Sequence, residues 1–583
     1  MHQNNQIHLV ELEKLHPHEE ADTQHLKELT RQIASDKVLK YAIVVDKKTN
    51  VILDGVHRYN VLKNLGCKNI PVVYVDYDSP KIEVQTWGDN RSLTKLDVIK
   101  AALTGKLFPP KTSRHMLRNS DVLTHISSIE KKVDMPLEIL KSNLELVPLR
   151  NIKTIMYVSL KDVLPTYTRF LRMESVDVPL ILDKKTKVLL DGYEAFHALD
   201  LLSAEKAPAF KVNINQVELK MRAYLTKEAI LEAIIKGEKL PPKSFTLLSE
   251  RIEINVPLKR LFRAERRNKK LLKIYNSSLE LLYEGWPTPL VKLRSISTND
   301  RSVWAKLECY NPFSKSVKDR VAWLMIKEAM DSGEFKQILY EATSTNTGIA
   351  LTSIANILGA KTRLYIPTTV QKASDVYLNV LGAEVVRLPV SLTVEAIDRV
   401  DAEANIQGAT HLNQFENDAN IKVHLKYTAR EIDQQLAGLG LKPTCIIGGI
   451  GTSGHMSAIA LYFKAKYGDD VKIVGVQPAQ NEVIPGIRRV ETGMKWIRWA
   501  KFDQLVDVKQ SEATEAAIKI ARKEGLLVGL SSGAVVHAFQ KIAEGKGVYV
   551  LVFPDDGYKY VEYFEKHLAD MQREELRNRH NQS

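Results

Sequence analysis

The sequence predicts an α/β protein in which a duplicated N-terminal domain precedes a larger α/β unit. The first observation is a repeat: VILDGVHRYN at residues 51–60 returns as VLLDGYEAFH at residues 188–197. The second is that both copies share a lead-in (VVDKKTN, ILDKKTK) and a trailing segment (FPPKTS, LPPKSF) in the same order. The third is that apolar strand-like runs alternate with helical patterns after about residue 270.

Length and composition bound the class of protein. At roughly 150 residues per domain, 583 residues suggest about four domains, or two medium ones and one large one. The chain is 44% hydrophobic and 26% charged, which is typical of globular proteins. No run approaches the ~18 apolar residues of a membrane span, and the N-terminus does not have the pattern of a secretory signal. Three widely spaced cysteines, Cys67, Cys309 and Cys445, predict neither a disulfide framework nor a zinc site. We therefore expect a reduced cytoplasmic protein without membrane contact.

The net charge of +13 is compatible with nucleic-acid binding or with small anionic ligands. No zinc finger or RNA-binding motif accompanies this charge. The most basic stretch, RLFRAERRNKKLLK at residues 260–273, has the composition of a solvated helical connector. Small anionic ligands are thus favoured over nucleic acid.

Each repeat predicts a strand, a turn, a second strand, a helix and a third strand. In the first copy, alternating apolar runs at residues 41–46 and 70–77 flank the motif, and the helix between them ends at Gly66. A helix is also expected at residues 22–36, and Pro109-Pro110 ends a later one. We place the first copy at residues 1–120, the second at 150–250 and the third domain at 270–583.

Six sequence segments in the last domain share a known order. They are GWPTPLVKL (285–293), NPFSKSVKDR (311–320), EATSTNTGIAL (341–351), LNQFENDAN (412–420), GGIGTSGHMSA (448–458) and VGLSSGA (528–534). In this order they resemble the cysteine synthase family of pyridoxal-phosphate (PLP) enzymes of fold type II. The resemblance implies a two-domain fold like that of the tryptophan synthase β subunit, and a homodimer.

The resemblance implies roles for the residues of these motifs. Lys318 would bond PLP covalently and later take the substrate Cα proton. Asn346 would bind the ring hydroxyl and Ser531 the pyridine nitrogen, where a neutral hydroxyl suits β-elimination followed by nucleophile addition. Backbone N–H groups of a glycine-rich loop at a helix N-terminus would hold the phosphate. The residues of that loop are Gly449, Gly451, Thr452, Ser453, Gly454 and His455.

The substrate carboxylate would be held by hydroxyl and amide groups. The candidates are Thr343, Ser344, Thr345, Thr347 and Gln414. Thr345 and Ser453 stand where the family commonly has glycine, and His455 stands where it has threonine. Arg488 and Arg489 lie where members acting on O-phosphoserine carry a cation, and an arginine fork matches phosphate oxygens.

The first 120 residues carry a second resemblance. The segments LHPHEE, VILDGVHR and KTSRH, in this order, resemble free serine kinases of the ParB/sulfiredoxin-like fold, which use ADP or ATP with Mg²⁺. Partition proteins share the DGxHR element and bind DNA or CTP. Glu19 would be the catalytic base, and Asp54 would hold Mg²⁺ or orient His57. Phosphate, nucleotide and serine contacts would come from Asp54, Gly55, His57, Arg58, Trp87, Lys111, Thr112, Ser113, Arg114 and His115. No P-loop motif is present.

The second copy retains the fold signals and loses the polar residues. Matching VSLKDVLPTYTRF to VELEKLHPHEEAD puts Tyr167 in the place of Glu19. His57 and Arg58 become Glu194 and Ala195, whereas a lysine and a hydroxyl persist as Lys243 and Ser244. We expect the second copy to be a scaffold or a regulatory domain.

Together the two resemblances predict a bifunctional enzyme. L-serine would become O-phospho-L-serine, and sulfide would then replace phosphate to give L-cysteine. One alternative keeps the PLP chemistry but uses another nucleophile, such as an amino-acid amine or homocysteine. Another makes the N-terminal half a nucleotide- or DNA-binding module that regulates the synthase. The motifs do not separate ADP from ATP.

Overall fold

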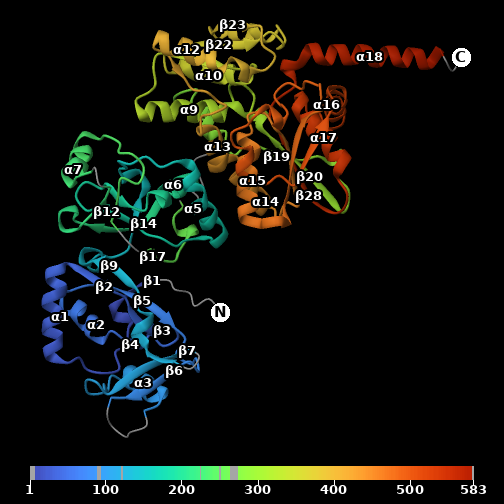
Figure 1. Ribbon diagram of the computed structural model, residues 1–583. Coiled ribbons are helices and arrows are strands. Elements are labelled where there is room, and N and C mark those ends of the chain that lie inside the picture. The colour runs from blue at the N-terminus through green and yellow to red at the C-terminus, as the bar shows by residue number, and fades with distance from the viewer. Residues whose placement is uncertain are drawn as a thin grey trace. The chain divides into compact units, whose positions relative to one another are not determined.

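The computed structural model describes residues 7–87, 93–119, 122–222, 225–247, 251–262 and 273–580. The chain forms two compact units, Met1–Arg266 and Arg267–Ser583 (Figure 1). Residues 263–272 of the basic connector, expected to be helical, lie outside the described residues. No described helix is long and apolar enough to cross a membrane.

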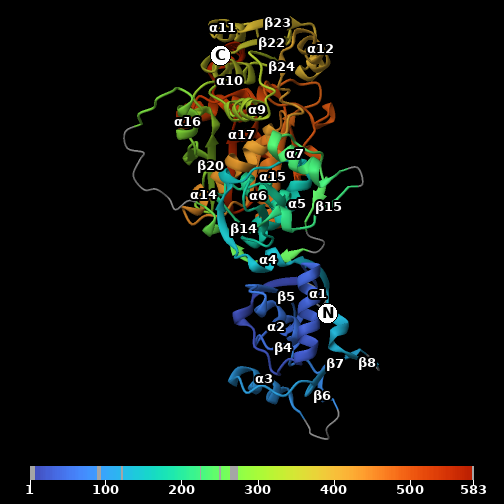
Figure 2. The same ribbon diagram turned by 90° about the vertical axis from the view of Figure 1, so that its left-hand side faces the viewer.

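The first sheet of the N-terminal unit is built around a strand hairpin and a helical crossover (Figure 2). Its strands, in spatial order, are β17 (Ile252–Glu253), β1 (Ile7–Glu11), β5 (Asn69–Val75), β3 (Ile43–Asp46) and β4 (Ile52–Asp54). Strands β3 and β4 are antiparallel, and helix α2 (Val56–Asn64) returns the chain so that β5 runs parallel to β3. Helix α1 (Thr23–Asp36) packs beside α2.

The second sheet repeats the order and directions of β1, β5, β3 and β4 in the first. It contains β10 (Glu145–Pro148), β14 (Lys206–Val212), β12 (Leu180–Asp183) and β13 (Leu189–Asp191). Helix α6 (Tyr193–Leu201) occupies the place of α2, and α5 (Leu160–Met173) that of α1. The two glycines before α2 and α6 both have left-handed backbones, with φ of 97° at Gly55 and 88° at Gly192. The two copies therefore correspond turn by turn.

This correspondence corrects one match made from the sequence. His16 bridges Val51 and Lys153 bridges Val188, whereas Glu19 bridges Phe108 and Met156 bridges Leu240. Met156 therefore stands in the place of Glu19, and the predicted match to Tyr167 is wrong. Tyr167 lies inside α5 and is fully buried. The sequence match set a helix of one copy against a loop of the other, because both segments contain proline and apolar residues at similar spacing.

Smaller elements complete the N-terminal unit. They are β2 (Val38–Tyr41) with β9 (Lys132–Pro136), β6 (Ile82–Thr86) with β7 (Ser113–Asn119) and β8 (Val122–His125), β11 (Ser175–Val176) with β18 (Val256–Pro257), β15 (Lys220–Met221) with β16 (Phe245–Thr246), and helices α3 (Lys95–Thr104), α4 (Leu137–Lys141) and α7 (Lys227–Lys236). One hydrophobic cluster contains core residues of both copies, such as Ile43 and Ile181.

The C-terminal unit contains two sheets. The larger comprises β19 (Leu290–Lys292), β20 (Arg301–Leu307), β28 (Gly547–Phe553), β25 (Cys445–Gly449), β26 (Lys472–Pro478) and β27 (Gln504–Val508), parallel except for β19. The smaller comprises β23 (Glu384–Leu388), β22 (Lys361–Pro367), β21 (Ile338–Ala342) and β24 (Thr410–His411), all parallel. Strand β25 is buried along its whole length, which is typical of a parallel strand covered on both faces.

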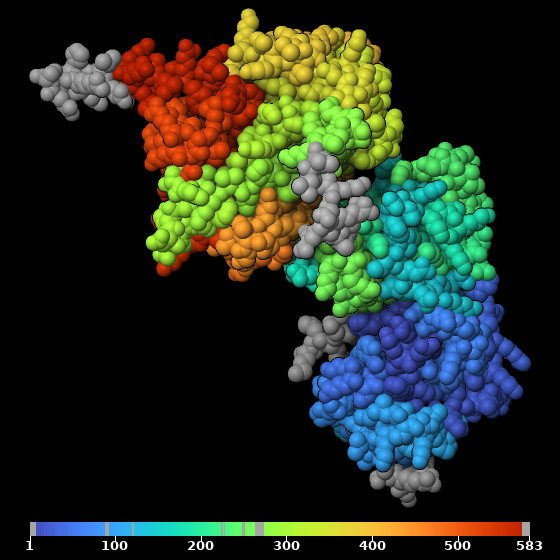
Figure 3. Space-filling view, turned by 180° about the vertical axis from the view of Figure 1, so that it is seen from behind, coloured from blue at the N-terminus to red at the C-terminus, as the bar shows by residue number. Residues whose placement is uncertain are grey.

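Helices follow the strands of both sheets. They are α8 (Glu280–Glu284), α9 (Lys318–Ser332), α10 (Asn346–Ile357), α11 (Ser374–Val380), α12 (Ile397–Gln407), α13 (Ala419–Val423), α14 (Ala429–Ala437), α15 (Gly454–Tyr467), α16 (Gln510–Glu524), α17 (Leu530–Ile542) and α18 (Val561–His580). Helix α18 extends outward from this unit (Figure 1), which is coloured from green through yellow and orange to red in the space-filling view (Figure 3). Helix α10 begins after the carboxyl end of β21, and α15 begins after that of β25. These sheet edges are where open α/β folds place ligands.

We expect Gly55→Ala to destabilise the N-terminal unit by about 2–4 kcal/mol, because φ is left-handed and an added Cβ would collide with Ile43. The matched control is Gly66→Ala, where φ is 71° and no atom lies within 4 Å of the added Cβ. It should cost only about 1 kcal/mol. Chemical unfolding measures both, and equal losses would contradict the packing argument.

Candidate functional site

Lys318 is the first residue of α9 and faces a cavity of about 170 Å³. Asn346, Ser531 and Asp555 line the same cavity. Burial lowers the pKa of Lys318 to about 8, although the nearby Asp555 carboxylate acts in the opposite direction. About a tenth of this amine is therefore neutral, and nucleophilic, at pH 7, far more than for an ordinary lysine of pKa ~10.4.

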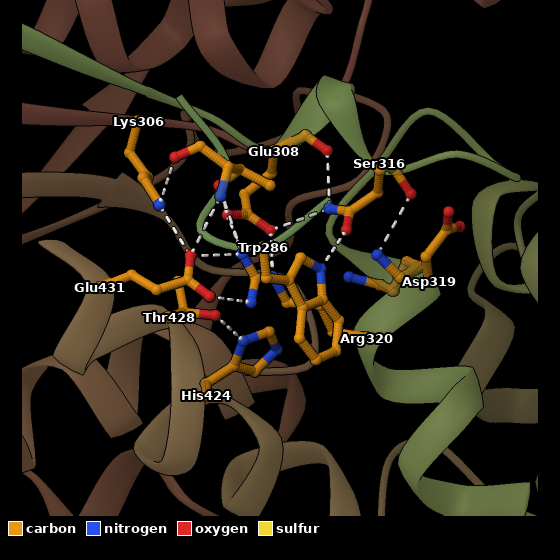
Figure 4. Close-up of polar contacts among 12 residues, drawn as sticks. Trp286, Lys306, Glu308, Ser316, Asp319, Arg320, His424, Thr428 and Glu431 are labelled. Carbon is orange, nitrogen blue, oxygen red and sulfur yellow. Dashed lines mark hydrogen bonds and ion pairs between the residues drawn. The ribbon is translucent and has the colours of Figure 1, made fainter. Parts of the chain in front are cut away.

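The two residues after Lys318 fix the start of its helix, and Figure 4 shows Arg320 among its partners and the backbone of Asp319 beside Ser316. Asp319 accepts hydrogen bonds from the backbone N–H groups of Phe313 (2.7 Å) and Ser314 (2.8 Å). Arg320 turns the other way and is fully buried. Within the Lys-Asp-Arg triplet, Lys318 therefore faces the cavity, Asp319 binds backbone N–H groups and Arg320 binds buried carboxylates.

Arg320 is the centre of a buried ionic network. Its guanidinium donates to Glu308 (2.6 Å) and Glu431 (2.7 Å) and lies 4.5 Å from the centre of the Trp286 ring. Lys306 donates to the same Glu431 carboxylate at 2.8 Å. Burial alone would raise the pKa of Glu431, but the two cations hold it well below its usual range. The network joins β20, α9 and α14.

The asparagine loop forms a second wall of the cavity. Asn346 donates to Asp555 Oδ2 at 2.8 Å, while Asn346 Oδ1 and Asp555 Oδ1 are buried without a partner among the described residues. Thr347 donates to Gln414 at 2.7 Å. Ser344 and Thr345 also line the cavity, whereas the Thr343 hydroxyl accepts the N–H of Gly348 and shapes the loop. Thr345 has φ of 143°, a region that favours glycine.

The glycine-rich loop joins β25 to α15. Gly451 and Thr452 line the cavity, and an added Cβ at Gly451 would collide with the Gly486 carbonyl. Ser453 has φ of 70°, and its hydroxyl is buried without a partner among the described residues. His455 packs behind the loop against His424, and burial lowers its pKa to about 3, so the ring is neutral.

These features fit a PLP cofactor. Gly449 and Gly454 bring the loop against Ile487 and Asn420, so that side chains larger than hydrogen are excluded there. The N-terminus of α15 and the unpartnered Ser453 hydroxyl suit its phosphate. Lys318, Asn346 and Ser531 offer an amine, an amide and a hydroxyl around one cavity.

Asp555 is a site residue that the sequence reasoning missed. It receives hydrogen bonds from Asn346 and from the Tyr560 hydroxyl, and its charge raises the pKa of Tyr560 further than burial alone. It lies in PDDG, immediately after the buried strand β28. A carboxylate at the end of a central parallel strand was the available signal.

The structure separates the two candidate arginines. Arg488 lines the cavity, donates to the Gly451 carbonyl at 3.0 Å and lies over Phe415. Burial lowers the pKa of Arg488 to about 10. Arg489 instead pairs with Asp507 (2.9 Å) and Glu491 (3.0 Å) on the surface. Only Arg488 is positioned to meet an anion beside Lys318.

In the N-terminal unit, Glu19 belongs to a compact polar cluster. Its carboxylate lies 3.2 Å from the Ser113 nitrogen and 3.1 Å from the Ser113 hydroxyl. His18 meets the same hydroxyl at 2.5 Å through Nε2 and the Ile52 carbonyl at 2.8 Å through Nδ1. Burial raises the pKa of Glu19 and lowers that of His18 to about 4. His18, in HPHE, was not predicted from the sequence.

Proton positions in this cluster follow from its acceptors. The Ile52 carbonyl can only accept, so neutral His18 carries its proton on Nδ1 and accepts at Nε2. Ser113 then donates to His18. The Glu19 carboxylate accepts the N–H of Ser113 and lies within hydrogen-bond distance of the same hydroxyl, so His18 and Glu19 are the two acceptors that face it.

Other predicted residues gather around this cluster. Trp87 donates to the Ser113 carbonyl at 3.1 Å, and the Arg114 guanidinium lies 4.6 Å from its ring centre. His57 accepts the N–H of Asp22, and the positive charge of Lys111 contributes to lowering its pKa after burial and His25. Thr112 donates to the Pro109 carbonyl, which shapes the loop that contains Lys111.

Two of the predicted phosphate contacts already have partners within the chain. Arg58 donates to the Ala42 carbonyl (2.9 Å), to Asp54 (2.8 Å) and to Glu130, so its guanidinium is already engaged, as is the Asp54 carboxylate. His115 is buried and bonded to the Tyr77 hydroxyl at 2.8 Å, away from the surface. Within the described ranges, no three His, Cys, Asp or Glu side chains are arranged to hold a metal ion.

The family comparison agrees with the C-terminal site. Residues 281–555 match the family described as pyridoxal-phosphate dependent enzyme. The chain belongs to this family, and its C-terminal half is a fold-type II PLP enzyme related to cysteine synthase.

Cysteine synthase B of Escherichia coli (strain K12) is 35% identical over 282 residues, which is 47% of this chain and 91% of the relative. Cysteine synthase of Staphylococcus aureus (strain Mu50 / ATCC 700699) is 34% identical over 290 residues, 47% of this chain and 92% of the relative. A solved hydrogen sulfide-producing enzyme from Fusobacterium nucleatum is 30% identical, with a TM-score of 0.45, over 49% of this chain and 100% of that one.

We expect Arg320→Met to destabilise the C-terminal unit by about 3–5 kcal/mol, because Glu308 would lose its buried counter-ion and Glu431 would lose one of its two. The control is Arg498→Met, since Arg498 is exposed. Denaturant unfolding followed by tryptophan fluorescence measures both, and a loss below about 1 kcal/mol for Arg320→Met would contradict the network's role.

The lowered pKa of Lys318 predicts how pH affects cofactor loading. Only the neutral amine attacks an aldehyde, so covalent PLP incorporation into the cofactor-free chain should rise with pH, with its midpoint at about 8. Borohydride reduction and mass spectrometry measure the fixed cofactor, with Lys318→Ala as the blank. A midpoint near the ~10.4 of an ordinary lysine would contradict the prediction.

Proposed function

We propose that this chain catalyses two consecutive reactions that convert L-serine to L-cysteine. In the first, the N-terminal domain transfers a phosphoryl group from ADP or ATP, with Mg²⁺, to the hydroxyl of free L-serine. The hydroxyl proton goes to a base, and O-phospho-L-serine forms. In the second, the C-terminal unit releases phosphate from that product and adds sulfide at the same carbon.

The observation that carries the proposal is Arg488 in the cavity of Lys318. A partly buried cation that lines the same cavity as the nucleophilic amine favours a substrate with an anionic leaving group, because phosphate oxygens pair with a guanidinium fork. Lys318 takes the Cα proton, and Arg488 holds the departing phosphate. PLP, when bound, spreads the charge left on Cα. Thr347 and Gln414 are close enough to one another to share a substrate carboxylate.

The Glu19 cluster supports the kinase reaction. Burial raises the pKa of this carboxylate and so makes it a stronger base than an exposed glutamate, and the Ser113 N–H and hydroxyl donate to one of its oxygens and hold it in place. Lys111 and Arg114 lie near the same cluster and supply positive charge for phosphate groups. The proposal includes two further points. The N-terminal domain belongs to the ParB/sulfiredoxin-like family, and the domain boundaries are those predicted from the sequence.

We expect Glu19→Gln to abolish phosphoserine formation, because the amide cannot take the serine proton. Phosphorus NMR follows the full chain with L-serine, Mg²⁺ and either ADP or ATP, in a Lys318→Ala background that leaves the product unconsumed. The nucleotide that yields a signal is the donor. If neither nucleotide yields phosphoserine, the kinase proposal fails and the N-terminal half is a binding module.

Arg488→Gln should raise KM for O-phospho-L-serine at least tenfold, about 1.4 kcal/mol, and change KM for O-acetyl-L-serine by less than twofold. The control, Arg489→Gln, should leave both constants unchanged because Arg489 pairs with Asp507. Sulfide-dependent cysteine formation is measured. Equal losses with the two substrates would show that Arg488 only supports the Gly451 loop.

Two alternatives give different results in these assays. If glutamate, another amino acid or homocysteine replaces phosphate while sulfide fails, the PLP chemistry stands with another nucleophile. If nucleotide or DNA binds without serine turnover, the N-terminal half is regulatory. The homodimer remains a prediction.

A further inference from the structure

The second copy of the N-terminal fold contains a cavity of about 360 Å³. It lies at the start of α6 and is closed by the segment that follows α7. Its polar lining combines both signs of charge with hydroxyl groups. The charged residues are Asp162, Asp191, Glu194, Lys220, Arg222 and Lys243.

This cavity is the counterpart of the Glu19 site. The Thr112 hydroxyl donates to Pro109 in the first copy, and the Ser244 hydroxyl donates to Pro241 in the second. Lys243 has φ of 56° and Lys111 has φ of 61°. The loop that flanks the candidate kinase site is therefore retained in shape.

The chemistry of the retained loop is different. Met156 stands in the place of Glu19, and its sulfur accepts the Ser244 N–H at 3.2 Å, as the Glu19 carboxylate accepts that of Thr112. A thioether cannot take a proton from an alcohol at neutral pH. A hydroxyl-bearing ligand in this cavity would therefore not be activated.

The charged side chains that line the cavity differ in whether they already have a partner within the chain. Asp191 is satisfied by the Thr246 hydroxyl (2.8 Å) and the Leu247 N–H (3.0 Å). Glu194 and Lys243 make no side-chain hydrogen bond or ion pair with any residue in the described part of the chain. An unpaired anion and an unpaired cation thus line one small cavity.

We propose that this cavity binds a free zwitterionic α-amino acid without reacting with it. Lys243, with Lys220 and Arg222, suits a carboxylate, and Glu194 suits an ammonium group. A volume near the lower end of ligand pockets, roughly 300–1,000 Å³, suits a small metabolite. The inference deepens the proposed function, since L-serine, O-phospho-L-serine and L-cysteine share this chemistry, and it makes the second copy a sensor of one of them.

Hydrogen exchange of the full chain in a Lys318→Ala background tests the proposal. L-serine, O-phospho-L-serine and L-cysteine are each titrated without nucleotide. At least one should protect residues 190–195 and 240–246. 3-Hydroxypropionate and ethanolamine, each lacking one charge of serine, should protect neither segment.

Glu194→Gln with Lys243→Gln should weaken that protection at least tenfold and leave protection of residues 52–58 unchanged. Neither side chain is in the core, so folding should be unaffected. Lys185→Gln with Glu228→Gln, on exposed residues outside the cavity, is the matched control. Absence of protection by all three amino acids, or protection that the double variant retains, overturns the proposal. Neither result depends on kinase turnover, which phosphorus NMR measures separately.

Discussion

The position of the reactive lysine depends on a buried ionic network a few ångströms away. Arg320 follows Lys318 by two residues and is held by Glu308 from the end of β20 and Glu431 from α14. Removing one partner of such a network costs roughly 3–5 kcal/mol because a charge is left uncompensated away from water. The first turn of α9 therefore has one stable placement relative to the large sheet. Asp319 accepts hydrogen bonds from the backbone of the preceding turn and so holds that turn against α9. This part of the cavity wall is therefore held in place as well.

The residues of the C-terminal site were predicted from six motifs whose order resembles that of a known family, and Lys318, Asn346 and Ser531 line one cavity. The asparagine and glycine loops lie at carboxyl edges of two parallel sheets, so that order along the chain becomes proximity in space. Asp555 was not predicted because acidic residues directly after a strand form no motif with a distinctive spacing. In the N-terminal domain, the sequence indicated that His115 and Arg58 could bind phosphate. It did not indicate that His115 is buried or that Arg58 pairs with Asp54. The match of Glu19 to Tyr167 was wrong because the two sequence segments are similar although one forms a loop and the other a helix. The backbone bridges show which residues occupy equivalent positions in the two copies.

The two N-terminal copies show how a fold can keep its backbone while its chemistry changes. Strand order, the glycine before the helix and the hydrogen bond closing the Pro-Pro loop all persist. Met156, in the place of Glu19, still accepts a hydrogen bond from a loop N–H, but its thioether cannot act as a base. Loop geometry thus survives the loss of proton transfer, and a cavity persists with it.

Thr345 and Ser453 hold backbones with positive φ in the two loops that shape the site, each at a place that glycine would occupy without strain. Such positions carry a penalty of about 1–3 kcal/mol each, which the surrounding packing must absorb. Thr345 lines the cofactor cavity, and the Ser453 hydroxyl is buried without a partner among the described residues. The chain has thus given up some thermodynamic stability and carries a hydroxyl group at each position. Glycine at either position would make the fold more tolerant of further mutations and would remove that hydroxyl.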